Sequence, residues 1–127
     1  MNQGRKKDMP YIKLSTSAKL DEVKKDALGA MFSDNIQIIQ GKTAEVTMIE
    51  CLDGTTMWKG GERRDCAFIY VRLFGSAPED QKQKLTEVFC AKVSEITGAE
   101  LANIFMNIYE SDTWGSRGAY RTLTNSP

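Results

Sequence analysis

The sequence predicts an α/β domain of two βαβ units, which together form a four-stranded mixed sheet with two helices on one face. Apolar periodicity changes from strand-like to helical and back, and it does so twice. The two copies also align without a gap at an offset of 57 residues. The matched pairs include Pro10 with Ala67, Tyr11 with Phe68, Ile12 with Ile69, Leu14 with Val71, Gly41 with Gly98 and Met48 with Phe105. A length of 127 residues suits a single domain.

The first unit is expected over residues 10–52. Alternating side chains predict a strand from Tyr11 to Ser15, and Ser17 is a candidate N-cap for the following helix. The buried face of that helix is expected to hold Leu20, Val23, Ala27, Leu28 and Met31. Gly41 ends the segment. Residues 44–51 are expected to form the second strand, and its buried positions are expected to include Val46, Met48 and Cys51.

The second unit is expected over residues 66–110. Residues 67–74 give the strongest strand signal in the chain. Ser76 as N-cap, with Glu79 three residues later and Pro78 in the first turn, predicts a capping box at the start of a helix. The apolar face of this helix is expected to hold Leu85, Val88, Phe89, Val93 and Ile96. Gly98 ends it, and residues 103–109 are the next predicted strand.

The remaining segments are an N-terminal extension at residues 1–8, expected to be disordered, a connecting loop at 53–65 and a tail at 111–127. The single folded domain is therefore expected over 9–127. Residues 57–59, placed before the Gly60–Gly61 pair, are a candidate extra strand that ends in a turn. The strands within each unit should be parallel, with a right-handed crossover. The sheet face without helices would then carry apolar side chains, and this predicts an oligomer.

Charge and hydropathy exclude two classes of partner. Lys and Arg together number 17, as do Asp and Glu, so the chain lacks the net basic surface that phosphate backbones require. No run approaches the roughly 18 apolar residues of a membrane span. The N-terminus has no apolar signal core, so we expect a cytoplasmic protein unless it is exported without a signal peptide.

The absence of histidine limits the possible chemistry. Without histidine, one chain cannot form Ser-His or Cys-His nucleophile pairs or a histidine-ligated metal site. The three cysteines, Cys51, Cys66 and Cys90, are widely spaced and form no metal-ligand pattern. We therefore expect no metal site from these residues, and nothing in the sequence implies an organic cofactor. Any catalysis would use a carboxylate, a lysine, a tyrosine or a terminal amine.

Several short motifs accompany the tandem βαβ pattern in a definite order. They are Met9–Pro10, Gly41–Lys42, Gly60–Gly61, Cys66–Ala67 and Asn107–Ile108–Tyr109. In order and spacing they resemble the macrophage migration inhibitory factor (MIF) family of the tautomerase superfamily, and the resemblance extends from Met9 to about Tyr120. It implies a homotrimer whose sheets enclose a central channel, with an active site at each subunit interface. The implied activity is keto–enol tautomerisation of a phenylpyruvate-like or dopachrome-like substrate.

The resemblance makes Pro10 the candidate catalytic residue. Tautomerisation needs a base that is unprotonated near neutral pH, and a free α-amino group, with a pKa of about 7.7–8.0, meets that need. In the family the initiator methionine is removed, and Pro10 matches the first proline. Eight residues precede Met9 here, however, and an uncleaved chain would make the Pro10 nitrogen a tertiary amide. Translation could start at Met9, the upstream residues could be removed, or they could be retained on a fold without this activity.

The resemblance also implies the substrate-binding residues. Lys42 matches a lysine that meets the substrate carboxylate, and Asn107 matches an asparagine that reaches across the subunit interface. The other candidates are Phe74 against the substrate, Phe105 where animal members have tyrosine, and Trp114 and Tyr120 at the aromatic rim. Ordinary packing or solvation is the alternative role for each of them, and a strand-start proline is the alternative for Pro10. The second cysteine of the family's Cys-Ala-Leu-Cys motif is absent from this chain, because Ile69 occupies its position.

Three functions remain open at this point. The first is a phenylpyruvate or dopachrome tautomerase-type isomerase that acts on a 2-keto acid, or an aromatic enol, with an aromatic or apolar group. The second is a non-catalytic trimer with a binding or cytokine-like role, in which the N-terminal extension blocks Pro10. The third is a decarboxylation or hydrolytic dehalogenation of the same superfamily, which would need extra arginines or a glutamate in the pocket. Arg72 and Arg117 are the candidates for that role.

Overall fold

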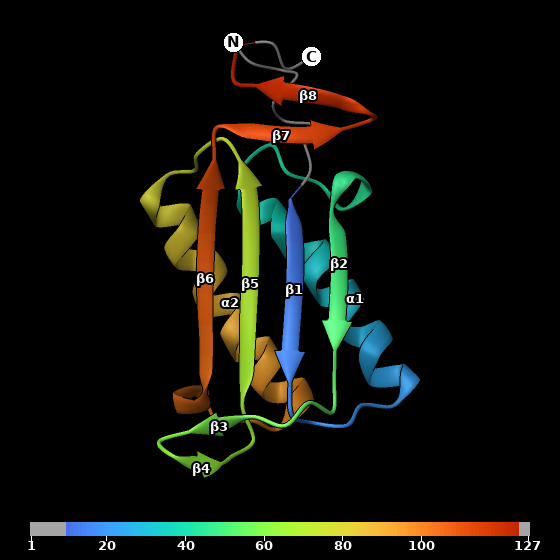
Figure 1. Ribbon diagram of the computed structural model, residues 1–127, viewed down its shortest axis with the longest axis vertical. Helices are drawn as coiled ribbons and strands as arrows, with labels where there is room; N and C mark the ends of the chain where they lie inside the picture. Colours follow the sequence, from blue (N-terminus) through green and yellow to red (C-terminus); the bar gives the residue numbers. More distant parts are fainter. Residues whose placement is uncertain (1–9, 125–127) are drawn as a thin grey trace.

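The computed structural model describes residues 10–124, so the predicted extension at 1–8 lies outside the described residues. In chain order the elements, with η for short 3-10 helices, are β1 (Tyr11–Thr16), α1 (Glu22–Asn35), η2 (Ile36–Ile38), η3 (Ala44–Val46), β2 (Met48–Leu52), β3 (Trp58–Lys59), β4 (Glu62–Arg63), β5 (Ala67–Phe74), α2 (Glu79–Thr97), η4 (Leu101–Asn103), β6 (Ile104–Ser111), β7 (Thr113–Ser116) and β8 (Ala119–Thr122). Four of the strands form one sheet in the order β2-β1-β5-β6. Both helices lie on the same face of that sheet (Figure 1).

The strand pairing confirms the predicted mixed sheet. β1 pairs with β2 in parallel, and β5 pairs with β6 in parallel, as two βαβ units require. The units join through the antiparallel pair β1–β5, in which Leu14 lies opposite Ile69 and Tyr11 lies opposite Arg72. Because this junction is antiparallel, β1 begins at the end of the sheet where β5 and β6 finish.

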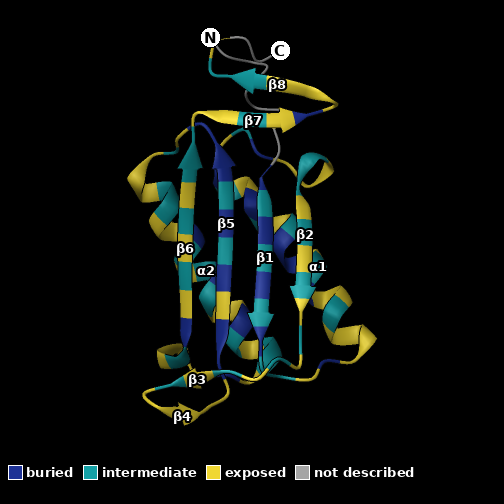
Figure 2. Ribbon diagram, in the orientation of Figure 1, coloured by how far each residue is buried: buried dark blue, intermediate teal, exposed yellow. Residues whose placement is uncertain are grey.

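The core lies between the sheet and the helices. Ile12 and Leu14 of β1 and Ile69 and Val71 of β5 are fully buried. These two central strands carry most of the buried sheet residues, whereas β2 and β6 at the edges are more exposed (Figure 2). Alternate residues of each strand point to the other face, as the period of two requires.

That other face is left uncovered within one chain. Its exposed apolar side chains lie on strands β2, β5 and β6. They include Met48, Leu52, Phe68, Phe105 and Tyr109. The sequence predicted this apolar face. An exposed apolar surface of this kind is typical of protein–protein interfaces. No helix in the described part of the chain is long and apolar enough to cross a membrane.

Two local predictions, both of helix N-caps, were wrong. Helix α1 is capped by Asp21, whose Oδ1 accepts the Lys24 N–H at 2.8 Å, and not by Ser17. Helix α2 starts after Pro78 with no side-chain cap from Ser76. The N–H of Ala77 instead donates to a Glu110 carboxylate oxygen 33 residues away, at 2.7 Å.

Three burial predictions were also wrong. Val23 is 77% exposed and Ala27 is exposed as well, because α1 turns both side chains away from the sheet. Residues 44–46 form a 3-10 turn, so β2 begins at Met48, which is 67% exposed on the uncovered face. Ile49 and Cys51 pack against the core, so the expectation for Cys51 is confirmed and that for Met48 is one residue out of register.

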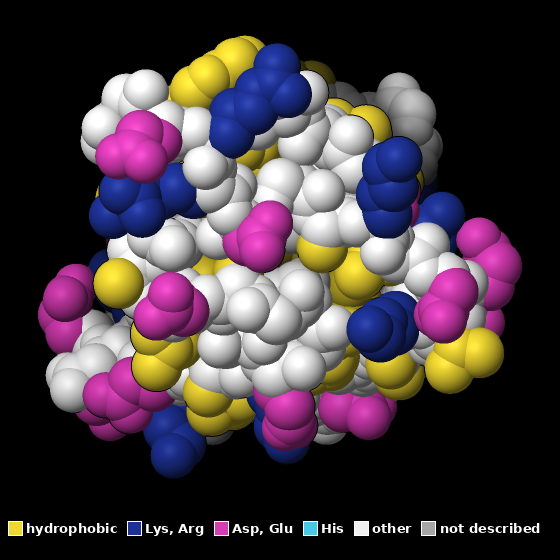
Figure 3. All heavy atoms as spheres, turned by 90° about the horizontal axis from the view of Figure 1, so that it is seen from below, with side chains coloured by type: hydrophobic (Ala, Val, Ile, Leu, Met, Phe, Trp, Pro, Cys, Tyr) yellow, Lys and Arg dark blue, Asp and Glu magenta, His cyan; other side chains and the backbone are white. Residues whose placement is uncertain are grey.

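Two hairpins lie at opposite ends of the sheet (Figure 1). β3 and β4 pair across Gly60–Gly61, and both glycines have positive φ, as a tight two-residue turn requires. The short strand predicted at residues 57–59 is thus present, at Trp58–Lys59. β7 and β8 pair in the tail across Arg117 and Gly118, which also have positive φ. Seen from the β3–β4 end, basic and acidic side chains are interspersed (Figure 3).

Candidate functional site

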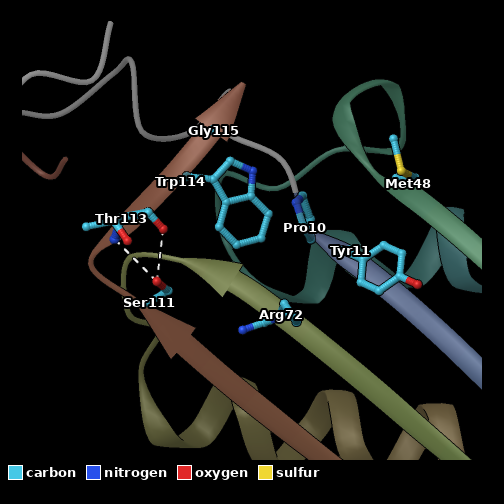
Figure 4. Close-up of a pocket in the computed structure, with 8 residues that line it drawn as sticks. All are labelled: Pro10, Tyr11, Met48, Arg72, Ser111, Thr113, Trp114 and Gly115. Carbon is cyan, nitrogen blue, oxygen red and sulfur yellow. Dashed lines mark hydrogen bonds between the residues drawn. The ribbon is translucent and has the colours of Figure 1, made fainter. Parts of the chain in front are cut away.

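A pocket of about 500 Å³ lies at the end of the sheet where β1 begins, under the β7–β8 hairpin. It is bounded by residues from β1, β2, β5 and the segment that leads from β6 into β7. They are Pro10, Tyr11, Met48, Arg72, Ser111, Thr113, Trp114 and Gly115 (Figure 4). The candidate base Pro10 is therefore part of the wall of a cavity large enough for a small organic substrate.

Pro10 is buried and held by the neighbouring strand. Its carbonyl oxygen accepts the N–H of Met48 at 3.1 Å, which extends the β1–β2 ladder by one residue. Proline fits this position because it lies at the start of the strand, where no ladder hydrogen bond needs its missing N–H. In Figure 4 its ring lies beside the indole of Trp114, at the cavity wall.

Three other predicted residues gather at the same end of the sheet. Lys42 is buried, with 8% of its surface exposed, and its Nζ donates to the Phe74 carbonyl oxygen at 3.2 Å. Phe74, at the last position of β5, is also buried, and its ring centroid lies 6.2 Å from that of Trp114. A buried ammonium and two aromatic rings thus accompany Pro10.

The β6–β7 connection is fixed by its own hydrogen bonds. The Ser111 hydroxyl donates to the Thr113 carbonyl oxygen at 2.9 Å, and the Thr113 N–H lies 3.3 Å from the same hydroxyl oxygen (Figure 4). The Gly75 N–H donates to the Ser111 carbonyl oxygen at 2.8 Å, which ties this turn to the end of β5. These contacts hold Trp114 over the cavity.

Several lining residues were not proposed as site residues from the sequence. They are Tyr11, Met48, Ser111, Thr113 and Gly115, while Arg72 was proposed only for a different reaction. The signal that could have found them is the strand register. Tyr11 lies opposite Met48 on one side and opposite Arg72 on the other, so the neighbours of Pro10 follow once the strand order is known.

Three predicted site residues lie elsewhere in this chain. Phe105 is 55% exposed near the far end of β6, where the Lys59 Nζ lies 6.0 Å from its ring centroid. Asn107 is exposed on the uncovered face, opposite Tyr70. Tyr120 is 69% exposed on β8. A single chain does not bring these residues to the pocket, and their roles stay predictions.

The tyrosine in the pocket and the cysteines elsewhere in the chain are poor alternatives to Pro10 as reactive groups. A hydrogen bond from the Tyr11 hydroxyl to Glu50 raises the pKa of Tyr11, so this phenol is a poor source of phenolate near neutral pH. Burial raises the pKa of the Cys51 thiol and of the Cys90 thiol, which disfavours their reactive thiolate forms. Within residues 10–124 no group of His, Cys, Asp or Glu side chains is arranged to hold a metal ion.

Comparisons with known proteins agree with this architecture. No protein-family profile and no curated protein matches the sequence. Among solved structures, Leishmania major MIF2 matches with a TM-score of 0.82 at 21% identity, over 90% of this chain and 98% of the other. The MIF-like protein of Entamoeba histolytica gives 0.78 at 20% identity, over 88% and 98%. The MIF homologue of Prochlorococcus marinus gives 0.77 at 18% identity, over 87% and 97%. The fold is therefore that of MIF-like proteins of the tautomerase superfamily.

Proposed function

We propose that the chain is a keto–enol tautomerase for a small 2-keto acid, with Pro10 as general base when Pro10 is its first residue. One observation carries the proposal: Pro10 is buried in the wall of a 500 Å³ pocket, at the end of the sheet where Lys42 is also buried. A secondary amine at this position would be held rigidly by its own ring and by the β1–β2 ladder.

The reaction moves one proton between carbon and oxygen. The Pro10 nitrogen takes a proton from the carbon next to the keto group, and the electron pair of that C–H bond forms the enolate. The enolate oxygen then takes a proton, and the amine returns its own proton to solvent. Burial disfavours the protonated amine, which keeps a free Pro10 nitrogen available as a base near neutral pH.

Binding of the substrate falls to the residues around Pro10. The Lys42 ammonium is the partner for the substrate carboxylate, because it is a buried cation at this end of the sheet. The side chain of the substrate packs on Trp114, whose indole lies beside Pro10. The enol oxygen is held by pocket backbone groups and by Asn107 of a neighbouring subunit.

That last contact requires a homotrimer. Within one chain, Asn107 lies on the uncovered sheet face, away from the pocket. The exposed apolar side chains of this face support association, because sheets packed around a central channel would bury them. Phe105 and Tyr120 would likewise reach a pocket only from another subunit.

A protein of the same fold supports the substrate class. Pt0534, which matches this chain with a TM-score of 0.76 at 18% identity, has been solved after inactivation by 2-oxo-3-pentynoate. That compound is itself a small 2-keto acid. Proteins of this fold can therefore admit such a molecule and react with it.

The second candidate is a non-catalytic trimeric protein with a binding role. It is favoured by the eight residues before Met9, because a peptide bond to Pro10 removes the basic lone pair of its nitrogen. The two candidates differ in whether the Pro10 nitrogen is a free amine or part of a peptide bond in the mature chain. The intact mass of the natively expressed protein distinguishes them, because it shows whether the upstream residues are present.

Three samples test the proposal: the full chain, a chain that starts at Pro10, and the latter with Pro10→Gly. Ketonisation of phenylpyruvate enol is followed by absorbance, after the intact mass of each sample has been measured. We expect turnover only from the chain that starts with Pro10, and a loss of about 100-fold or more with Pro10→Gly. Equal turnover by a full chain of verified mass would reject the proline-base mechanism. So would undiminished turnover by Pro10→Gly.

A further inference from the structure

We propose that Arg72 binds a second anionic group of the substrate, so that the site selects 2-keto acids with a distal carboxylate. This inference deepens the proposed function and rests on it for the reaction, but the binding it describes can be measured without turnover. It changes the expected substrate from a keto acid with an aromatic group to one with a second carboxylate. It also gives a role to Arg72, which has none in the mechanism above.

The position of Arg72 follows from the strand register. Arg72 lies in β5 between Tyr11 of β1 and Tyr109 of β6, and Tyr11 follows Pro10 directly. The side chain lies on the uncovered face and contributes to the same cavity wall as Pro10 (Figure 4). Among the described residues that line the pocket, Arg72 alone carries a charge.

The contacts of Arg72 leave its charge available. The guanidinium carbon lies 4.9 Å from the ring centroid of Tyr109 and 5.6 Å from that of Tyr70. Neither ring takes a hydrogen bond from the five N–H donors at the edge of the guanidinium. Arg72 makes no ion pair with a carboxylate in residues 10–124. Glu50, on the same sheet face, accepts a hydrogen bond from Tyr11.

This arrangement suits a carboxylate ligand. A planar guanidinium binds a carboxylate with two parallel hydrogen bonds, and such charge-assisted bonds are stronger than neutral ones. Contacts with two aromatic rings restrict the guanidinium beforehand, so less conformational entropy is lost on binding. The site is therefore prepared for an anion in a pocket that also offers apolar surface from Trp114 and Met48.

A second cation sets the length of the ligand. The Lys42 ammonium is bound to the carbonyl oxygen of Phe74, two residues beyond Arg72 in the same strand. Because Arg72 and Phe74 are two residues apart in a strand, their Cα atoms lie about 7 Å from each other. A short 2-keto acid with a carboxylate at each end can place its first carboxylate at Lys42 and its distal carboxylate at Arg72, with the reacting carbon between them near Pro10.

A matched pair of five-carbon acids tests the inference. The probes are 2-oxoglutarate and 2-oxopentanoate, which differ in whether the chain ends in a carboxylate or a methyl group. With the chain that starts at Pro10, exchange of the proton next to the keto group is followed by NMR in deuterated water. We expect kcat/KM to favour 2-oxoglutarate by about tenfold to hundredfold, the effect of one charge-assisted contact.

Arg72→Met should remove most of that preference, and Arg72→Lys should retain part of it, since a lysine keeps the charge without the planar fork. Arg63→Met is the matched control, because Arg63 also stacks on an aromatic ring, Trp58 at 5.5 Å, but at the opposite end of the sheet. We expect Arg63→Met to leave the preference unchanged. An equal loss for both acids in Arg72→Met, or no preference in the parent chain, would overturn the inference.

Calorimetric binding separates this inference from the proposed function. If neither acid shows exchange, the tautomerase proposal fails, and binding of the same two acids decides the role of Arg72. Tighter binding of 2-oxoglutarate that Arg72→Met abolishes would support the anion site on a non-catalytic protein. Equal binding of the two acids would overturn it.

Discussion

The two βαβ units share a scaffold and differ in chemistry. At the offset of 57 residues, α1 and α2 begin together, at Glu22 and Glu79, and the turns η3 and η4 coincide. Matched core positions are apolar in both units. The pairs are Ile12 and Ile69, Leu14 and Val71, Leu28 and Leu85, Phe32 and Phe89, Ile36 and Val93, and Ile39 and Ile96. The core is therefore a repeated design.

A charged cluster at the start of each helix is repeated as well. In the first unit the Lys25 Nζ lies 3.3 Å from Glu22 and 3.7 Å from Asp53. Asp53 also accepts the N–H of Leu20 at 2.8 Å. This cluster joins the beginning of α1 to the end of β2, and it contacts the turn that leads from β1 into α1.

The second unit has the same cluster 57 residues later. There the Lys82 Nζ lies 2.8 Å from Glu79 and 3.1 Å from Glu110, and Glu110 accepts the N–H of Ala77. Each residue of the cluster thus has its counterpart in the first unit. These charges belong to the repeated scaffold, because they occur in both units whatever chemistry lies at the ends of the sheet.

The two ends of the sheet differ where the chemistry is proposed. A second pocket of about 400 Å³ lies at the opposite end, and some of its wall comes from counterparts of the first pocket. Thr56 and Met57 stand there in place of Thr113 and Trp114. The residues proposed to act on the substrate have small, uncharged counterparts in the other unit. These are Ala67 for Pro10, Ala99 for Lys42 and Ser15 for Arg72. Positions where the repeat breaks are therefore the best guide to function.

The largest expected effect tests whether the core is truly repeated. Phe32 and Phe89 are both fully buried and meet edge to face, with ring centroids 4.9 Å apart. Phe32→Ala and Phe89→Ala should each lower the free energy of unfolding by about 3–5 kcal/mol, from lost burial and the cavity left behind. Urea unfolding at one fixed protein concentration measures both. Costs that differ by more than twofold would show that the two units do not share the core equally.

The next effect separates function from stability at Lys42, a position where the two units carry different residues. Lys42→Ala gives the first unit the residue of its counterpart, Ala99. On the proposed function, kcat/KM for phenylpyruvate should fall by about tenfold to hundredfold, the value of one charge-assisted contact. The melting temperature should change little, since removing a buried ammonium also removes its desolvation cost. Lys84→Ala, an exposed lysine on α2, is the control. Full activity in Lys42→Ala would remove Lys42 from the site.

A smaller effect is expected where a buried polar residue replaces an apolar one. Thr16 is fully buried, and its hydroxyl donates to the Cys66 carbonyl oxygen at 3.0 Å, while its counterpart is Leu73. Thr16→Val keeps the shape and removes the hydrogen bond, so the free energy of unfolding should fall by about 1–2 kcal/mol. Thr56→Val, at an exposed site, should change it by less than about 0.5 kcal/mol. A Thr16→Val protein as stable as the parent would show that the hydrogen bond only replaces apolar packing.

The sequence predicted the repeated parts of the molecule better than the parts that depend on distant contacts. Strand β5 was predicted at its observed bounds, and Gly98 ends α2 in the left-handed conformation. Both results rest on local patterns. The N-cap of α1 was missed because Asp53 takes the Leu20 N–H from 33 residues away and so fixes where the helix can begin.

The site shows the same division. Lys42, Phe74 and Trp114 were proposed from the family resemblance, and the structure places them at the same end of the sheet as Pro10. Arg72 has no local signal that marks it as a pocket residue, because its place follows from strand order and register. Phe105, Asn107 and Tyr120 lie away from this pocket in one chain, so their proposed roles depend on the proposed trimer.

The smallest expected effect tests the repeated charged cluster through its pH dependence. The Leu20 N–H, and then the nearby Lys25, lower the pKa of the Asp53 carboxyl from its ordinary value of 3.8. A carboxyl with a lower pKa in the folded state stabilises the protein above its ordinary pKa, and this contribution is lost as the pH falls through the folded value.

The substitution Asp53→Asn keeps an oxygen that can accept the Leu20 N–H, but the new side chain cannot ionise. The variant should melt below the parent at about pH 6, and the difference should shrink towards about pH 3. Asp26→Asn, at an exposed site on α1, is the control and should show no such convergence. A difference that stays constant over this range would mean that the hydrogen bond to Leu20 stabilises the turn without any help from the charge of Asp53.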